Sequence, residues 1–152
     1  MARPEPHRLH DYRHTRALTT RWMDNDAYGH MNNVVHYSLF DTVVNSYLID
    51  NGVLDVAKGA VIGLVVETGC HYFSALGFPQ PVTGALRVAH LGRSSVRYEV
   101  GLFGDASAPA AAQGHFVHVY VDRESQRPVE LPAALRRALE PLLVANPTPE
   151  DT

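Results

Sequence analysis

Residues 21–40 read RWMDNDAYGHMNNVVHYSLF, and they mark a junction between a strand and a helix. The first part of the stretch is rich in acids, amides and glycine, whereas apolar residues recur at helical spacing from residue 34 to residue 50. We therefore predict an amphipathic helix over residues 34–50. Asn32 or Asn33 can cap its first turn, and Asn51-Gly52 is typical of a left-handed helix stop.

The other predicted elements are mostly strands. Residues 16–22 are Thr-rich and mix apolar with polar side chains, as a half-exposed strand does. Four later segments are rich in β-branched and aromatic residues and are separated by Gly or Pro turns: 61–72, 82–91, 95–103 and 114–122. Leucines at helical spacing predict a short helix over residues 131–144, with Pro141 disturbing its last turn. The order indicates an α+β domain with an antiparallel sheet of about five strands.

The chain has 152 residues, which is enough for one domain. We expect a single domain over residues 13–145, between a flexible N-terminal arm at residues 1–12 and a C-terminal tail at residues 146–152. Both ends are polar, contain prolines and show no hydrophobic period. A composition of 45% hydrophobic and 19% charged residues excludes wholesale disorder.

Charge and cysteine content narrow the class of protein. The formal net charge of -3 disfavours nucleic acid as a partner. Cys70 is the only cysteine, so an intrachain disulfide and multi-cysteine metal sites are excluded, and its strand setting suggests a buried thiol. We expect no metal site. The N-terminus lacks a secretory signal and no apolar run approaches the roughly 18 residues of a membrane span, which favours a cytoplasmic protein with no membrane partner.

The junction at residues 21–40 also offers chemistry. The first turn of a helix presents unpaired N–H groups and partial positive charge, which can stabilise an oxyanion on a substrate carbonyl. Asp26 precedes Asn33 by seven residues, close enough to place a carboxylate beside such a site. The alternative is that Asp24 and Asp26 serve only the turn, since aspartate often bonds to nearby backbone.

The residue pattern of the junction resembles that of hotdog-fold thioesterases, in the branch typified by 4-hydroxybenzoyl-CoA thioesterase. The matching residues are Asp24, Asp26, Gly29, His30, Asn32 and Asn33. The order of predicted elements also matches, from about residue 16 to residue 144. The resemblance implies a sheet wrapped round one long central helix, plus the short C-terminal helix.

The resemblance also implies roles for single residues. Asp26 takes the place of the catalytic acid, as nucleophile or general base, and the backbone amide of Asn33 or its neighbour takes that of the oxyanion donor. His30 could polarise the carbonyl, orient Asp26 or protonate the leaving thiolate, or its ring could be satisfied by the loop backbone. A second branch of the fold places its acid on the central helix, where Asp41 is the reserve candidate and a solvated face is its simpler explanation.

Substrate contacts are expected from five further residues. Asn32 could touch the thioester oxygen, or only cap the helix. His36 stands where many relatives have Tyr near the acyl pocket, and it could instead bond to backbone. Arg93, Ser94 and Ser95 occupy a hairpin that in similar enzymes lies near the CoA nucleotide, with Arg93 as the phosphate candidate.

The expected protein is thus a thioesterase that hydrolyses an acyl-CoA to the free acid and CoA. No cofactor is implied, since coenzyme A is part of the substrate. The sheet has two edges, and pairing of edges predicts a homodimer, or a tetramer made of two dimers, with the site between protomers. The alternatives are a hydratase or dehydratase acting on acyl thioesters, and an acyl-CoA-binding protein without catalysis.

Overall fold

The central helix of the computed structural model, which describes residues 3–145, ends at the predicted residue and begins one residue before the predicted start. Helix α1 spans Asn33–Asp50. The Asn32 side chain accepts a hydrogen bond from the Val34 N–H, so Asn32 is the N-cap. Gly52 follows the helix with a φ of 69°, the left-handed conformation that glycine adopts at least cost.

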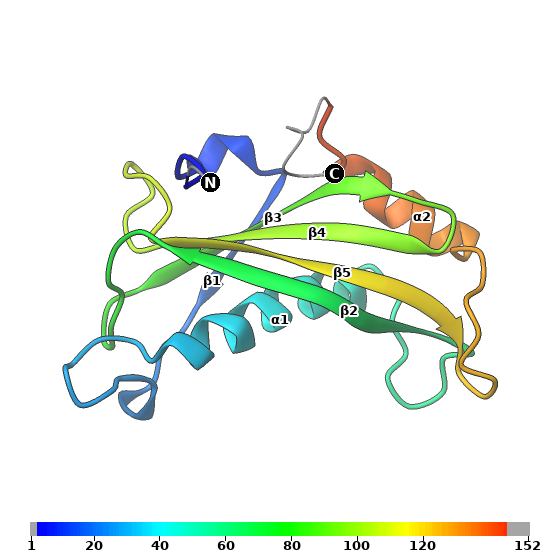
Figure 1. The fold of residues 1–152 in the computed structure, drawn as a ribbon, viewed down its shortest axis with the longest axis horizontal. Coiled ribbons are helices and arrows are strands. Elements are labelled where there is room, and N and C mark those ends of the chain that lie inside the picture. The colour runs from blue at the N-terminus through cyan, green and yellow to red at the C-terminus, as the bar shows by residue number, and fades with distance from the viewer. Residues whose placement is uncertain (1–2, 146–152) are drawn as a thin grey trace.

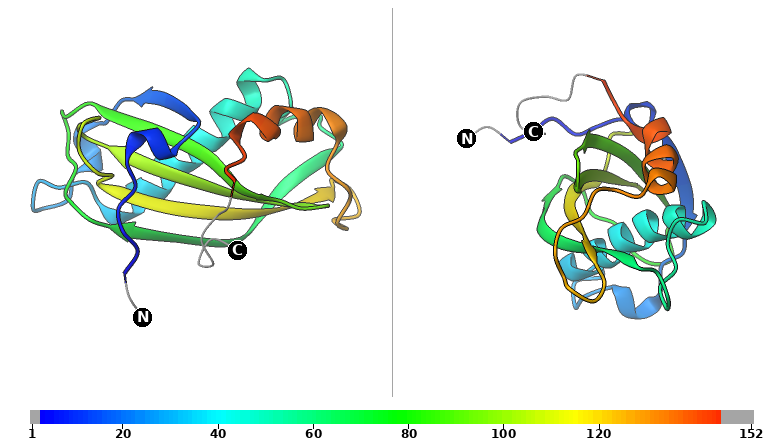
Figure 2. Two further views of the ribbon diagram at one scale, coloured as in Figure 1. Left: turned by 90° about the horizontal axis from the view of Figure 1, so that it is seen from above. Right: turned by 90° about the vertical axis from the view of Figure 1, so that its right-hand side faces the viewer.

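Five antiparallel strands form one sheet in the order β1-β3-β4-β5-β2 (Figure 1). Their bounds are His14–Leu18 for β1, Val61–Tyr72 for β2, Val82–Leu91 for β3, Ser95–Phe103 for β4 and Ala112–Asp122 for β5. The sheet curves round α1, which lies along its concave face (Figure 2). This arrangement confirms the predicted α+β fold of a sheet wrapped round one long helix.

The core lies between α1 and the concave face of the sheet. Phe40, Val43 and Val44 of α1 are fully buried against side chains of β3, β4 and β5. Gly114 of β5 lets the helix approach closely, because a Cβ there would lie 2.6 Å from the Phe40 ring and 2.4 Å from the Gly69 carbonyl oxygen. Burial of this apolar surface holds α1, and hence the junction before it, in a fixed position on the sheet.

Three other predicted elements differ in their bounds. The first strand is His14–Leu18 rather than residues 16–22, because residues 22–24 turn into a 3-10 helix in which Asp24 accepts hydrogen bonds from Arg21. β5 starts two residues earlier than predicted, at Ala112. The C-terminal helix α2 is only Ala133–Leu139, and the chain continues as a 3-10 turn over Glu140–Leu142, where Pro141 interrupts the helical pattern.

Residues 5–12 lie on the convex face of the sheet, the face opposite α1. The Gln113 side chain of β5 accepts from the His7 N–H and donates to the Glu5 carbonyl. Tyr12 is buried there, and its ring is nearly perpendicular to that of Phe103, with 6.0 Å between the ring centroids. The tail expected at residues 146–152 lies outside the described residues, as do residues 1–2.

Candidate active site

A tight loop joins β1 to α1 and carries Asp26. The Asp26 N–H donates to the His30 carbonyl at 2.8 Å, and the Gly29 N–H donates to the Asp26 carbonyl. Gly29 has a φ of 77°, so it provides the left-handed turn of this loop. The loop is also tied to the segment after β2, because Met31 donates its N–H to the Leu76 carbonyl at 2.7 Å.

The Asp26 carboxyl group is held by one of its two oxygens. Oδ1 accepts hydrogen bonds from the N–H groups of Tyr28, at 2.9 Å, and His30, at 3.3 Å. No partner for Oδ2 lies within residues 3–145, and the side chain is half-buried. The carboxylate is therefore oriented by the backbone while one oxygen stays available to a substrate or a water molecule.

His30 contacts Asp26 through its main chain. Its N–H donates to Asp26 Oδ1, whereas its ring is exposed and bonds to no group among residues 3–145. The geometry thus supports a role of His30 in shaping the loop. The ring is free to turn towards a bound substrate.

The first turn of α1 presents an unpaired donor next to this loop. Asn32 has a structural role. Its side chain accepts a hydrogen bond from the Val34 N–H, and its own N–H donates to the Asp24 carbonyl at 2.9 Å. The Asn33 N–H has no acceptor within residues 3–145, and the residue is exposed. This N–H stands at the positive end of an 18-residue helix, where a developing oxyanion would be stabilised.

His36 lies one turn further along, on the inner side of α1. It is buried, and its Nδ1 is 3.3 Å from the Asn32 carbonyl oxygen, to which it donates in the matching tautomer. Burial lowers the pKa of His36 from its usual 6.5, and the backbone hydrogen bond opposes that shift. The ring is therefore a neutral packing group at neutral pH, as the backbone-bonded alternative describes.

Tyr72 is a site neighbour that sequence reasoning missed. It ends β2, its hydroxyl donates to the Asn33 carbonyl at 3.1 Å, and its ring meets His36 edge to face at 4.8 Å. The contact joins residues 39 positions apart, so no local pattern points to it. Asn25 was missed for the same reason: its side chain accepts from the Phe78 N–H at 3.0 Å, 53 positions away.

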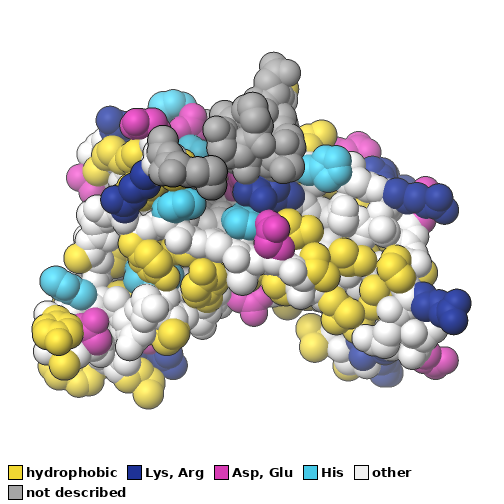
Figure 3. All heavy atoms as spheres, viewed as in Figure 1, with side chains coloured by type: hydrophobic (Ala, Val, Ile, Leu, Met, Phe, Trp, Pro, Cys, Tyr) yellow, Lys and Arg dark blue, Asp and Glu magenta, His cyan; other side chains and the backbone are white. Residues whose placement is uncertain are grey.

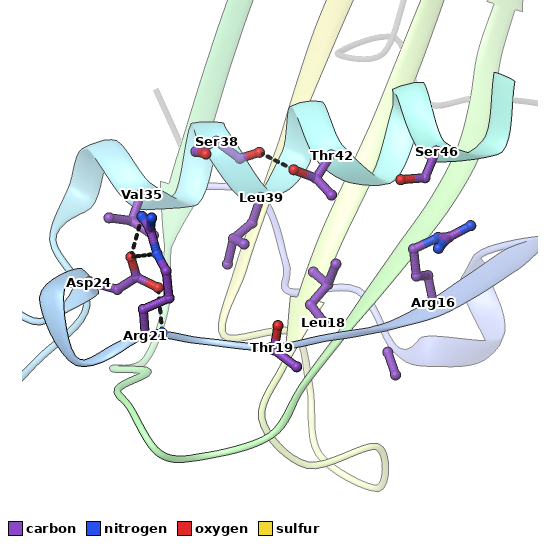
Figure 4. Close-up of a pocket in the computed structure, with 11 residues that line it drawn as sticks. Arg16, Leu18, Thr19, Arg21, Asp24, Val35, Ser38, Leu39, Thr42 and Ser46 are labelled. Carbon is purple, nitrogen blue, oxygen red and sulfur yellow. Dashed lines mark hydrogen bonds and ion pairs between the residues drawn. The ribbon is translucent and has the colours of Figure 1, made fainter. Parts of the chain in front are cut away.

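A polar cavity of about 400 Å³ lies on the other side of the loop, between β1 and α1 (Figure 4). The hydroxyl side chains of Ser38, Thr42 and Ser46 line its helical wall. Arg21 and Asp24 close one end as an ion pair, with Arg21 Nη2 2.9 Å from Asp24 Oδ1. Both charges at this end are thus already paired.

The hairpin residues Arg93, Ser94 and Ser95 do not join Asp26 within one chain. The Asp26 loop contacts Leu76, before β3 begins, and the hairpin follows the end of this ten-residue strand, about 30 Å away along the sheet. The Arg93 side chain is exposed, and the backbone carbonyl of Arg93 accepts a hydrogen bond from the Leu131 N–H. A site that uses both segments must combine two chains.

Asp41 also stands apart from the loop. It is exposed in the middle of α1, and its carboxyl group accepts a hydrogen bond from the Asn45 side chain at 2.9 Å. This is the surrounding that a solvated helix face provides. No group of three or more His, Cys, Asp or Glu side chains within residues 3–145 is arranged to hold a metal ion.

Hydrophobic side chains gather along the sheet edge formed by β2 (Figure 3). Leu64, Val65 and Val66 are 37%, 50% and 61% exposed. A second exposed apolar group surrounds the Asp26 loop and includes Trp22 and Tyr28. None of the helices in residues 3–145 is long and apolar enough to cross a membrane.

Comparison with known proteins assigns the family. The model of the thioesterase-like superfamily matches residues 20–139, which include the Asp26 loop, α1 and the sheet from β2 to β5. The chain belongs to the thioesterase-like superfamily. Its fold is the hotdog fold that the junction motif predicted, and thioester hydrolysis is the class of activity that this family supports.

Solved structures agree with this thioesterase-like fold. The PA5185 protein of Pseudomonas aeruginosa strain PAO1 is 52% identical, with a TM-score of 0.87 over 90% of this chain and 96% of its own. The 1,4-dihydroxy-2-naphthoyl-CoA thioesterase of Synechocystis is 14% identical, with a TM-score of 0.75 over 82% and 93%. The BH1999 gentisyl-coenzyme A thioesterase is 19% identical, with a TM-score of 0.73 over 83% and 99%. No curated protein sequence matches the chain.

Proposed function

We propose that this thioesterase-like protein hydrolyses an acyl-CoA to the free acid and coenzyme A, with Asp26 acting at the thioester carbonyl. The observation that carries the proposal is the pairing of an oriented carboxylate, Asp26, with the unpaired Asn33 N–H at the start of α1. Two proteins of the same fold carry names of acyl-CoA thioesterases, which favours coenzyme A as the thiol carrier.

Two routes of bond making fit this arrangement. In one, Asp26 Oδ2 attacks the carbonyl carbon, the thiolate leaves, and water then hydrolyses the acyl anhydride. In the other, Asp26 accepts a proton from water as the water attacks, and the tetrahedral intermediate expels the thiolate, which takes up a proton. In both, the Asn33 N–H holds the oxyanion, and water is the only co-reactant, so no cofactor is required.

The site is completed by a second copy of the chain, which we propose pairs through β2. This edge strand has 12 residues, against five in β1, and carries the exposed side chains of Leu64, Val65 and Val66. A long apolar edge strand with unpaired backbone groups favours association with another strand. Two such strands form a dimer, and two dimers form the tetramer that the sequence also allows.

Thiol release from a panel of acyl-CoAs tests the function. The native protein should release CoA, and Asp26→Asn should lower kcat by at least about a hundredfold, because an amide is a poor base and nucleophile. The Asn side-chain oxygen can still accept from Tyr28 and His30, so the loop should keep its shape. Single-turnover hydrolysis in ¹⁸O-water adds to this test, because label in Asp26 would establish the nucleophilic route: it arises only when water attacks the aspartyl carbonyl of the acyl anhydride.

Asp41→Asn is the matched control, an exposed acid of α1 changed in the same way. Its thiol release should stay within a few-fold of the native rate. Loss of activity in Asp41→Asn with activity retained in Asp26→Asn would move the catalytic assignment to the helix. If no acyl-CoA releases thiol, absorbance at the enoyl thioester band tests for hydration, and binding without turnover would identify an acyl-CoA-binding protein.

A further inference from the structure

A second cavity, of about 340 Å³, lies at the other end of α1 from the Asp26 loop. It is enclosed by the C-terminal half of α1, residues 53–56, the start of β2, and β5. Most of its walls are apolar: Leu48, Val53, Leu54, Val61 and Leu135. Its volume falls in the range of about 300–1,000 Å³ that is typical of sites for small organic molecules.

His118 is the unusual group in this cavity wall. It lies on β5 between Phe116 and Tyr120, on the concave face, and is 5% exposed. Neither ring nitrogen has a hydrogen-bond partner among residues 3–145, and Nε2 is fully enclosed. A neutral imidazole has one N–H donor and one acceptor, and burial of such groups without partners is unfavourable.

The charge state of His118 is set by its surroundings. Burial lowers the pKa of His118 to about 4, and the Asp41 carboxylate on α1 opposes that shift. The aromatic neighbour Tyr98, at 5.0 Å between ring centroids, adds no charge at neutral pH. His118 therefore faces the cavity as a neutral ring suited to a hydroxyl group, which both donates and accepts hydrogen bonds.

Gly63 of β2 leaves this ring approachable. Gly63 is paired with Tyr120 across the sheet, and a Cβ at position 63 would lie 3.1 Å from His118 Nδ1 and 3.0 Å from the Tyr120 ring. Any larger residue would fill the space beside Nδ1. His118 thus adds a polar ring to a cavity whose wall is mostly apolar, and Asn45, Tyr120 and Arg123 are the other polar side chains that line it.

The β2 pairing proposed above connects this cavity to catalysis. Antiparallel pairing of two β2 strands about a two-fold axis places the start of one strand, at Val61, opposite the end of the other. The end of β2 is Tyr72, whose hydroxyl is bonded to the Asn33 carbonyl at the start of α1. In such a pair, the cavity of one copy lies at the same end of the paired strands as Tyr72 and the start of α1 of the other copy.

We propose that this cavity receives the acyl group of the thioester, and that His118 hydrogen-bonds to a hydroxyl group carried on the acyl chain away from the carbonyl. The proposal rests on the function proposed above and specifies its substrate class. A hydroxyacyl thioester gives His118 Nδ1 a hydrogen-bond partner, while the rest of its acyl chain contacts apolar side chains. An alkyl chain of equal length leaves His118 without a partner.

Matched substrates test this preference. Each ω-hydroxyacyl-CoA from four to eight carbons is compared with the alkanoyl-CoA that is one carbon longer, so that both have the same number of heavy atoms. For the chain length that reaches His118, the native protein should show a kcat/KM ratio of at least about ten in favour of the hydroxyl, since a site built to bond a hydroxyl discriminates against its absence. His118→Leu should lower this ratio to about one.

Two further variants keep the test decisive. His115→Leu changes a histidine of the same strand that faces the convex side and bonds to Glu67, so the ratio should stay at its native value. Gly63→Ala fills the space beside Nδ1 and should lower the ratio without removing the imidazole, which covers a failure of His118→Leu to fold. Equal kcat/KM for both members of every pair in an active native enzyme would overturn the role of His118, whereas absence of thiol release from every acyl-CoA would overturn the proposed function itself.

Discussion

Asp24 and Asp26 stand two residues apart, yet their carboxyl groups have different surroundings. Asp24 is 2% exposed and accepts hydrogen bonds from the backbone and guanidinium of Arg21. Asp26 is half-buried and keeps Oδ2 without a partner among residues 3–145. Asp24 therefore builds the loop, whereas Asp26 is the acid that a substrate can reach.

Asp24→Asn is predicted to destabilise the fold more than Asp26→Asn does. The amide that replaces the Asp24 carboxylate would lose charge-assisted hydrogen bonds at a buried position, which costs about 1–2 kcal/mol because the Arg21 partner is itself mostly exposed. Urea unfolding of both variants at neutral pH measures this difference. Equal midpoints for the two variants would show that the Arg21 pairing contributes little.

Cys70 is predicted to react slowly with thiol reagents. Burial raises the pKa of its thiol to about 11, from a usual 9.0. At pH 8 the thiolate fraction is then about a hundredfold lower than in the unfolded chain, and only the thiolate reacts. Stopped-flow labelling should give one slow equivalent when native and one fast equivalent in denaturant, since Cys70 is the only cysteine. A fast reaction of the native protein would contradict the burial of this thiol.

At the scale of elements, the sequence predicts the long strands well and the short one badly. β2, β3 and β4 match their predicted bounds because each is a run of β-branched and aromatic residues between Gly or Pro turns. β1 has only five residues, and Arg21 and Asp24 end the extended region through contacts that composition does not express. The motif located the Asp26 loop and Asn33 because these residues are close together in the sequence. Tyr72 and Asn25 were missed because their roles depend on contacts between distant segments.

The β2 edge is predicted to carry the dimer. Replacing Val65 and Val66 together by lysine places like charges on both copies of the paired strand, which opposes edge pairing. Light scattering should then give the mass of one chain, 16.8 kDa, in place of a multiple of it, and thiol release should fall because each site lacks its second copy. The control is Leu143→Lys, an exposed apolar residue that follows the C-terminal 3-10 turn and lies beside β3 rather than β2, which should keep the native mass. A fully active single chain would contradict the shared site.

For the whole molecule, the buried histidines link stability to pH. Burial is the largest cause of the lowered pKa values of His14, His36, His115 and His118. Each of these rings binds its proton more weakly in the folded than in the unfolded chain, so unfolding takes up protons in acid. Their contribution to stability is complete above pH 6.5 and is lost as the pH falls below that value.

His118 is predicted to supply much of this acid sensitivity. Between its unfolded pKa of 6.5 and its folded pKa of about 4, stability falls with pH, and by pH 5 the loss is about 2 kcal/mol. Urea midpoints at pH 7.5 and pH 5 should therefore differ less in His118→Leu than in the native protein. An unchanged difference would mean that His118 is not a neutral buried ring.

The two edges of the sheet are unequal, and this inequality limits how large an assembly can grow through strand pairing. β1 offers five residues, among them Arg16, whose guanidinium is bonded to Asp50 at the end of α1, whereas β2 offers 12. Only one edge strand of this sheet, β2, is therefore long enough and apolar enough to pair with another copy. In the proposed dimer the two β2 strands pair with each other, and the sheet edges left over are both the short β1 strands. Strand pairing through β2 then ends at two copies, so a tetramer has to form through other surfaces, and the long apolar strand cannot recruit further chains into a fibre.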